Sequence, residues 1–88
     1  MIIISQSKRM IINLESILGL GLSSLEDKSI AIKMYESNDR VGITIARYET
    51  AKRAQEVLQE IVNKYRQYNL DNNKAVTMLP KVYEMPKE

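Results

Sequence analysis

The chain has 88 residues, a net charge of +2, and neither cysteine nor histidine. Its length is that of one domain, and its hydrophobic content of 44% is typical of a folded protein rather than a disordered tail. The missing residue types exclude disulfide bridges, thiolate or imidazole metal sites, and catalysis by histidine-activated serine or cysteine. We therefore expect a small non-catalytic protein that is cytoplasmic and has no cofactor, no bound metal and no membrane contact.

Two isoleucine-rich clusters open the chain. Ile2–Ile4 and Met10–Ile12 flank the polar run Ser5–Arg9, which is the pattern of a strand, a turn and a second strand. The branched Cβ atom of isoleucine costs less rotamer freedom in an extended chain than in a helix. We expect strands at both clusters.

A third strand is predicted at Ile17–Leu22, where glycine alternates with leucine. Side chains alternate between the two faces of a strand, so the leucines at 18, 20 and 22 share one face. Gly19 and Gly21 leave the other face bare. We expect a bulge, a sharp coil of the sheet, or the close approach of another element at these glycines.

A β-hairpin is predicted in the middle of the chain. Ile30–Tyr35 and Val41–Arg47 alternate apolar and polar residues, and the turn-forming run Glu36–Arg40 separates them. The side chains expected to face inward are those of Ile30, Ile32, Met34, Val41, Ile43 and Ile45.

The stretch Tyr48–Tyr68 predicts one long amphipathic helix, for which Thr50 is the expected N-cap. A helix with one apolar face needs a surface to cover, so we expect it to lie on the sheet. At 1.5 Å per residue it is longer than a small sheet is wide, so its last turn is expected to overhang. The predicted apolar face consists of Ala51, Ala54, Val57, Leu58, Ile61, Val62, Tyr65 and Tyr68.

After the helix, which is expected to end near Asn69, the chain predicts little regular structure. Ala75–Leu79 suits a short strand or a packed loop, and Pro80 prevents its continuation as a central strand. Val82–Met85 predicts a short edge strand. Together the elements predict a single α+β domain over residues 1–88. In it, an antiparallel meander of about five strands is packed by one long helix, followed by a short C-terminal strand or extended tail.

No catalytic or metal-binding motif emerges from the sequence. The segment Gly19–Gly21 lacks the third glycine and the lysine of a phosphate-binding loop. The acidic residues at 26–27, 36, 39 and 71 do not have a calcium-loop spacing and suit solvated turns. The favoured hypothesis is therefore a protein–protein interaction module, with a homo-oligomer or another protein as partner. Tyr65 and Tyr68, at the overhanging end of the helix, are its predicted contact residues.

The alternative hypothesis is a nucleic-acid-binding accessory protein. Arg47, Lys52 and Arg53 are its predicted contacts, because basic side chains pair with phosphates and the five tyrosines offer surfaces on which bases can stack. Glutamates interleave with the basic residues of the helix, as on an ordinary solvated face, which favours the interaction module.

Three stretches resemble small uncharacterised proteins of Gram-positive bacteria and their prophages. They are Ile3–Lys8 with Met10–Asn13, the strand-to-helix junction Ala46–Thr50, and the segment Val82–Pro86. The resemblance implies a β-meander followed by one helix, and a gene carried by a mobile element. That family has no assigned activity, so no site residue is implied. The chain is also similar to pleckstrin-homology-type barrels, but with fewer strands before the helix and no tryptophan in it, so lipid or peptide binding is not implied.

Overall fold

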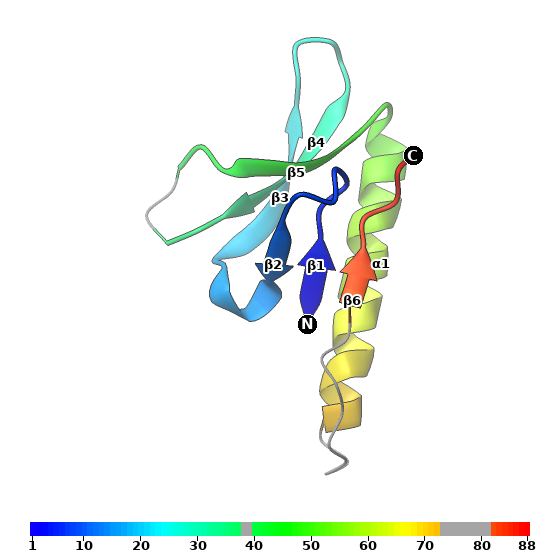
Figure 1. Ribbon diagram of the computed structural model, residues 1–88. Helices are drawn as coiled ribbons and strands as arrows, with labels where there is room; N and C mark the ends of the chain where they lie inside the picture. The colour runs from blue at the N-terminus through cyan, green and yellow to red at the C-terminus, as the bar shows by residue number, and fades with distance from the viewer. Residues whose placement is uncertain (38–39, 73–81) are drawn as a thin grey trace.

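The computed structural model describes residues 1–37, 40–72 and 82–88, and for residues 68–72 it describes the backbone alone. Within these ranges the chain forms an α+β fold, as predicted (Figure 1). Its elements are β1 (Ile2–Ile4), β2 (Ile11–Asn13), a 3-10 helix η1 (Leu14–Ser16), β3 (Gly19–Ser24), β4 (Ile30–Tyr35), β5 (Ile43–Tyr48), α1 (Ala51–Asn72) and β6 (Val82–Glu84). The predicted element at Ala75–Leu79 lies outside the described residues.

The described strands form two three-stranded sheets, and the predicted meander is confirmed in the antiparallel sheet β3-β4-β5. The other sheet has the order β2-β1-β6, in which β6 pairs parallel to β1 with Ile3 opposite Tyr83. The break between the sheets falls at η1, where the Asn13 side chain accepts a hydrogen bond from the Glu15 N–H at 3.1 Å. This short helix redirects the chain, so β3 pairs with β4 rather than with β2.

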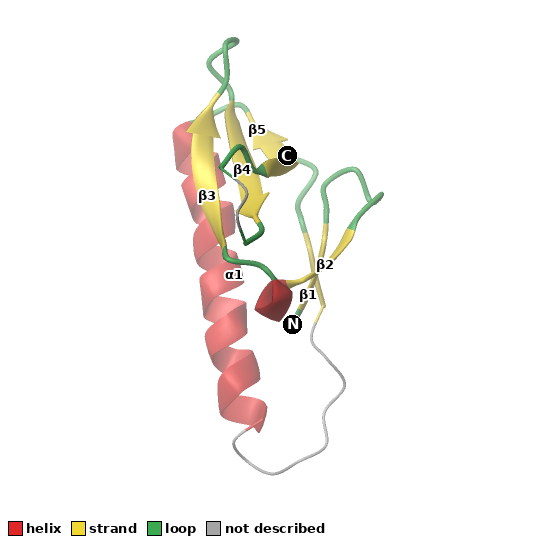
Figure 2. Cartoon of the chain, turned by 90° about the vertical axis from the view of Figure 1, so that its left-hand side faces the viewer, coloured by secondary structure: helices red, strands yellow, loops and turns green. Residues whose placement is uncertain are grey.

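The helix α1 begins where the sequence places its cap. Thr50 Oγ1 accepts a hydrogen bond from the Arg53 N–H at 3.1 Å, and the Thr50 carbonyl accepts one from the Ala54 N–H. Tyr48, expected at the start of the helix, instead ends β5, and the helix continues past its expected end to Asn72. Figure 2 shows its C-terminal turns extending beyond the β3-β4-β5 sheet.

One hydrophobic core connects the two sheets and the helix. Ile3 of β1, Ile32 of β4 and Val57 of α1 are its largest fully buried side chains. Burying each stabilises the fold by about 1.5–3 kcal/mol. The buried members are Met1, Ile3, Ile12, Ile32, Met34, Ile45, Ala46, Tyr48, Ala54, Val57, Ile61, Tyr83 and Met85.

The inward face predicted for the strand Val41–Arg47 is wrong at Val41, which precedes β5, and at Ile43, and both are exposed. The register between β4 and β5 shifts after Ile32, which pairs with Ala46, whereas the next residue pairs with Thr44. Ile45 is therefore the extra residue of a β-bulge, and both it and Ala46 are buried. A bulge reverses the alternation of side chains, so Ile43, two residues before Ile45, faces solvent.

Four further residues assigned to apolar faces are exposed, namely Leu18, Leu22, Ala51 and Val62. Leu18 precedes β3 rather than lying in it, and Ala51 is in the first turn of α1. Val62, at the margin of the apolar face of α1, is 37% exposed. Val62 thus leaves part of the apolar face of α1 uncovered in the C-terminal half of the helix.

Two glycines make room for the Tyr35 ring. A Cβ atom built at Gly21 would lie 3.2 Å from Tyr35 Cε2, so the close approach predicted there is confirmed. Gly42 has a φ of +80°, and a Cβ atom there would lie 2.7 Å from Tyr35 Cε1. At Gly19 no atom lies within 4 Å of the corresponding position. Tyr35 therefore covers bare backbone on the outer face of the sheet.

Candidate interaction site

An apolar groove of about 390 Å³ lies between η1, β3 and the C-terminal half of α1. Leu14, Leu20 and Tyr65 line it and pack against the core while remaining half-buried. The full lining is Leu14, Leu20, Leu58, Ile61, Val62, Tyr65 and Arg66. This apolar groove is a surface suited to another protein rather than to a charged small molecule.

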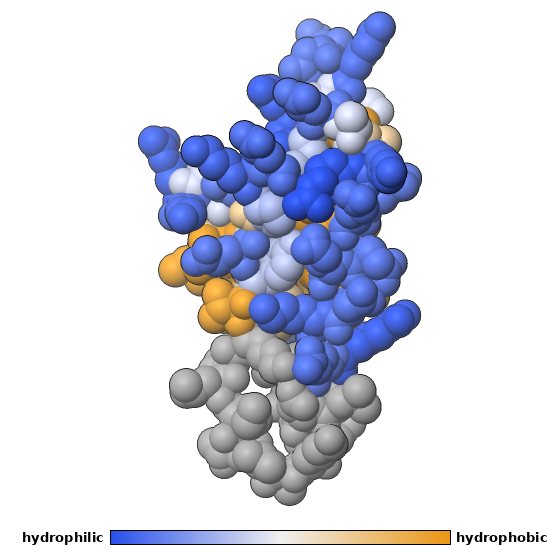
Figure 3. Space-filling model, turned by 90° about the vertical axis from the view of Figure 1, so that its right-hand side faces the viewer, coloured by the Kyte–Doolittle hydropathy of each residue, from blue (hydrophilic) through white to orange (hydrophobic). Residues whose placement is uncertain are grey.

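The groove contains one of the two tyrosines predicted as contact residues. Tyr65 lines it from the helix side, next to Val62. The side chain of Tyr68 lies outside the described residues. On the α1 side the molecular surface is mainly hydrophilic, with hydrophobic residues mostly at the left margin and a smaller group at the upper right (Figure 3). This hydrophilic surface agrees with the prediction that the charged face of the helix is exposed to solvent.

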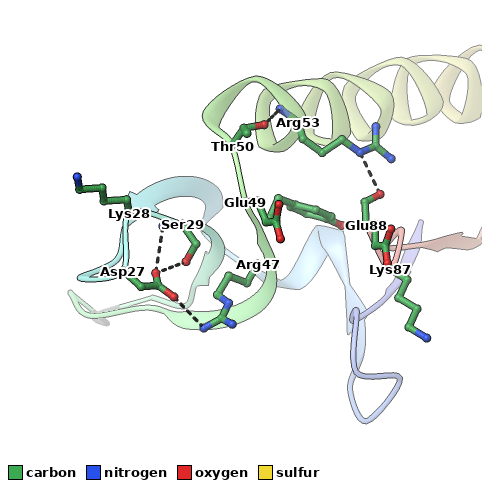
Figure 4. A pocket seen from close by; sticks show the side chains of 10 residues that line it. Asp27, Lys28, Ser29, Arg47, Glu49, Thr50, Arg53, Lys87 and Glu88 are labelled. Atoms are coloured by element: carbon green, nitrogen blue, oxygen red, sulfur yellow. Dashed lines mark hydrogen bonds and ion pairs between the residues drawn. The ribbon is translucent and has the colours of Figure 1, made fainter.

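A second cavity, the polar pocket, has a volume of about 800 Å³ (Figure 4). It forms where the β3–β4 turn, the end of β5, the start of α1 and the C-terminal segment meet. Its lining residues, four of them basic and three acidic, are Asp27, Lys28, Ser29, Arg47, Tyr48, Glu49, Thr50, Arg53, Lys87 and Glu88. The charges nearly balance, so the polar pocket does not present a strongly basic surface.

The polar pocket brings together Arg47 and Arg53, two of the three predicted nucleic-acid contacts, whereas Lys52 is exposed and does not line it. Arg47 Nη1 lies 3.6 Å from Asp27 Oδ2, and Arg53 Nη1 lies 3.7 Å from carboxylate oxygens of both Glu56 and Glu60. Both arginines thus have carboxylate partners already.

Burial and hydrogen bonding perturb the titration of groups at this pocket. Burial raises the pKa of Tyr48 to about 12, although the nearby Arg53 guanidinium opposes the shift. Hydrogen bonds from the Ser29 hydroxyl and N–H lower the pKa of the Asp27 carboxyl. Tyr48 stays protonated and Asp27 stays ionised near neutral pH. Neither is poised to exchange a proton there, so this geometry does not favour acid–base catalysis.

Burial, with the Glu60 carboxylate next in importance, also raises the pKa of Tyr83 in β6. The Tyr83 hydroxyl lies 3.5 Å from Glu60 Oε1, and Lys64 Nζ lies 5.9 Å from the centroid of the Tyr83 ring. These contacts attach β6 to the polar side of α1.

A side chain that the sequence did not single out connects the pocket to the rest of the fold. The Gln6 amide accepts a hydrogen bond from the Arg47 N–H at 2.8 Å and donates to the Arg47 carbonyl at 3.0 Å. The same amide nitrogen lies 3.2 Å from the Pro86 carbonyl and 2.9 Å from the Lys87 carbonyl. Gln6 therefore joins the β1–β2 turn, the end of β5 and the C-terminal segment. No local pattern around a glutamine in a polar turn signals such a role.

Across the described part of the chain, no group of three or more acidic side chains is placed to hold a metal ion. No helix in these same ranges is long and apolar enough to cross a membrane. Comparison with protein-family models, curated proteins and solved structures found no match to this chain.

Proposed function

We propose that the protein is a non-catalytic cytoplasmic protein–protein interaction module, encoded by a mobile element, that self-associates through its apolar surface. The observation that carries the proposal is the apolar groove, which places Tyr65 and the exposed Val62 beside β3. Apolar side chains left at a surface groove gain free energy when a partner covers them. The mobile-element origin rests on the resemblance in sequence alone.

The test is multi-angle light scattering across a dilution series of the native chain. We expect a concentration-dependent rise in mass that the Val62→Lys variant abolishes, because the change places a charge inside the covered surface. Val62 is partly exposed, so the variant should fold. The matched control is Gln67→Lys, which adds the same charge to an exposed position of the same helix. A native chain that stays monomeric at high concentration would refute self-association.

Nucleic-acid binding is the second candidate, and the convergence of Arg47 and Arg53 at the polar pocket is the observation in its favour. It predicts a gel shift that weakens with salt and with the double change Lys52→Gln and Arg53→Gln. Arg40→Gln, at an exposed position in the β4–β5 turn, is the control. If no shift occurs at low salt, this candidate is excluded.

A further inference from the structure

Among the described residues, none pairs with the outer edge of β3. β3 pairs with β4 on one side, and no described residue makes a backbone hydrogen bond to its other side. The strand Gly19–Ser24 contains neither a charged residue nor a proline. Charges, prolines and short strands are the features by which soluble proteins prevent an edge from pairing with another chain. This edge has none of them.

The other described sheet edges are short or occupied. β5 is held from outside by Gln6, whose N–H donates to the Ile45 carbonyl at 2.9 Å and whose side chain bonds to the backbone of Arg47. β2 and β6, the outer strands of the second sheet, have three residues each. A strand from another chain therefore has one long edge to join in the described structure.

The hydrogen-bond pattern fixes which groups point out of that edge. The Leu25 N–H donates to the Ser29 carbonyl at 2.9 Å, at the end of the β3–β4 ladder. Bonded positions alternate along an antiparallel strand, so Gly21 and Ser23 bond to β4 as Leu25 does. The N–H and carbonyl groups of the intervening residues, at positions 20, 22 and 24, face outward.

We propose that β3 pairs antiparallel with β3 of a second copy of the chain, across a two-fold axis at Leu22. Two three-stranded sheets thereby become one sheet of six strands. The inference rests on the proposed function, for which it names the partner. In this register Leu22 faces Leu22 of the second copy, and Leu20 faces its Ser24. Every outward backbone group of β3 then has a partner.

An axis at Gly21 is disfavoured by the structure. It would pair Ser24 with Leu18 of the second copy, and the Leu18 N–H already donates to the Tyr35 carbonyl at 2.7 Å. The axis at Leu22 uses residues of the strand alone. Because the described part of each copy has one such edge, the pairing closes as a dimer rather than growing into a fibre.

The pairing also explains the exposed leucine of β3. Leu20 lines the apolar groove, and Leu22, two residues further on, shares its face. In the dimer the two Leu22 side chains meet as a cross-strand pair beside the two grooves. The backbone edge and the apolar groove thus belong to one interface.

Cross-linking tests the register directly, because the chain has no cysteine of its own. Residues opposed in a bonded pair have Cα atoms about 5.5 Å apart, within the range that a disulfide spans. Leu22→Cys should therefore form a covalent dimer under mild oxidation at least about tenfold faster than Ile11→Cys. Ile11 is 77% exposed on β2, so its thiol is at least as accessible.

Charge and shape variants test the same pairing without oxidation. Leu22→Lys places two like charges opposite each other and should weaken self-association at least about tenfold. Leu22→Thr, which is uncharged and suits a strand, should retain it. Leu22 is 37% exposed, so both variants should fold, and circular dichroism checks this. If the lysine variant does not fold, the cross-linking of Leu22→Cys alone decides whether the β3 strands pair.

The outcomes separate this inference from the proposed function. Self-association that is unchanged in Leu22→Lys, with no faster cross-linking at position 22, would overturn the β3 pairing and leave the interaction module intact. A native chain that is monomeric throughout would overturn both. Rapid cross-linking at position 22, with loss of self-association in Leu22→Lys but not in Leu22→Thr, would support the six-stranded sheet.

Discussion

Removal of the Gln6 amide should destabilise the whole fold, although the side chain lies in a turn. In Gln6→Ala, the β1–β2 turn loses its side-chain link to Arg47 and to the carbonyls of Pro86 and Lys87. The amide has two N–H donors and a carbonyl acceptor, so it supports about three good hydrogen bonds among these four contacts.

The expected loss follows from those bonds. A hydrogen bond within a protein contributes about 0.5–1.5 kcal/mol net, and several of the freed groups lie near the surface, where water replaces the amide. We expect a decrease in the free energy of unfolding of about 1.5–3 kcal/mol. For a domain of this size, that lowers the melting temperature by roughly 6–24 °C.

Urea unfolding followed by circular dichroism measures the change. The midpoint should fall while the dependence of the free energy on urea stays constant, because the same surface unfolds. The control is Gln59→Ala. Its amide bonds to the Asn63 side chain at 2.9 Å on the exposed face of α1, and its loss should cost less than about 0.5 kcal/mol. Equal effects of the two variants would refute a linking role for Gln6.

Three further predictions concern single contacts. Burial raises the pKa of Tyr48 from 10.0 to about 12 in the fold. The folded state therefore holds this proton more tightly than the unfolded state, so its contribution to stability is complete below pH 10 and is lost as the pH rises toward 12. Tyr48→Phe should flatten that decline in thermal melts from pH 9 to 12, and an unchanged decline would contradict the assignment. Gly42→Ala should cost about 1–3 kcal/mol in urea unfolding, because its φ is positive and the new Cβ would meet the Tyr35 ring. Gly19→Ala, with open space around it, should be nearly neutral, and similar losses would show that the ring contact is not the cause. Thr50→Ala should cost about 1 kcal/mol and Thr50→Ser much less, since only serine keeps a hydroxyl to cap α1; equal thermal melts would argue against the cap.

Local chemistry accounts for what the sequence predicts correctly. Isoleucine clusters and alternating runs place strands, and a hydroxyl at Thr50 starts the helix, because each of these signals acts between near neighbours in the chain. The groove residue Tyr65 was predictable for a similar reason. It lies late on an apolar face that is longer than the sheet beneath it, so it is left only partly covered.

The remaining features depend on contacts between distant segments. The bulge at Ile45 could not be predicted from the sequence. The extra residue is itself apolar, so the alternation of Val41, Ile43 and Ile45 looks like that of a regular strand. The placement of Arg47 and Arg53 at one pocket, and the pairing of β6 with β1, follow from tertiary packing rather than from local pattern. Sequence periodicity indicates which face of an element is apolar, but not which element will cover it.

The parallel pairing of β6 with β1 has a consequence for how the chain is made. Ile3 pairs with Tyr83, so the N-terminal sheet acquires its third strand only after synthesis has reached β6. Until then the three consecutive isoleucines of β1 present an unpaired edge, and closing so long a loop is slow. During translation this edge is open to pairing with other nascent chains, as the longer edge of β3 is. Pairing with β6 therefore removes the open edge of β1.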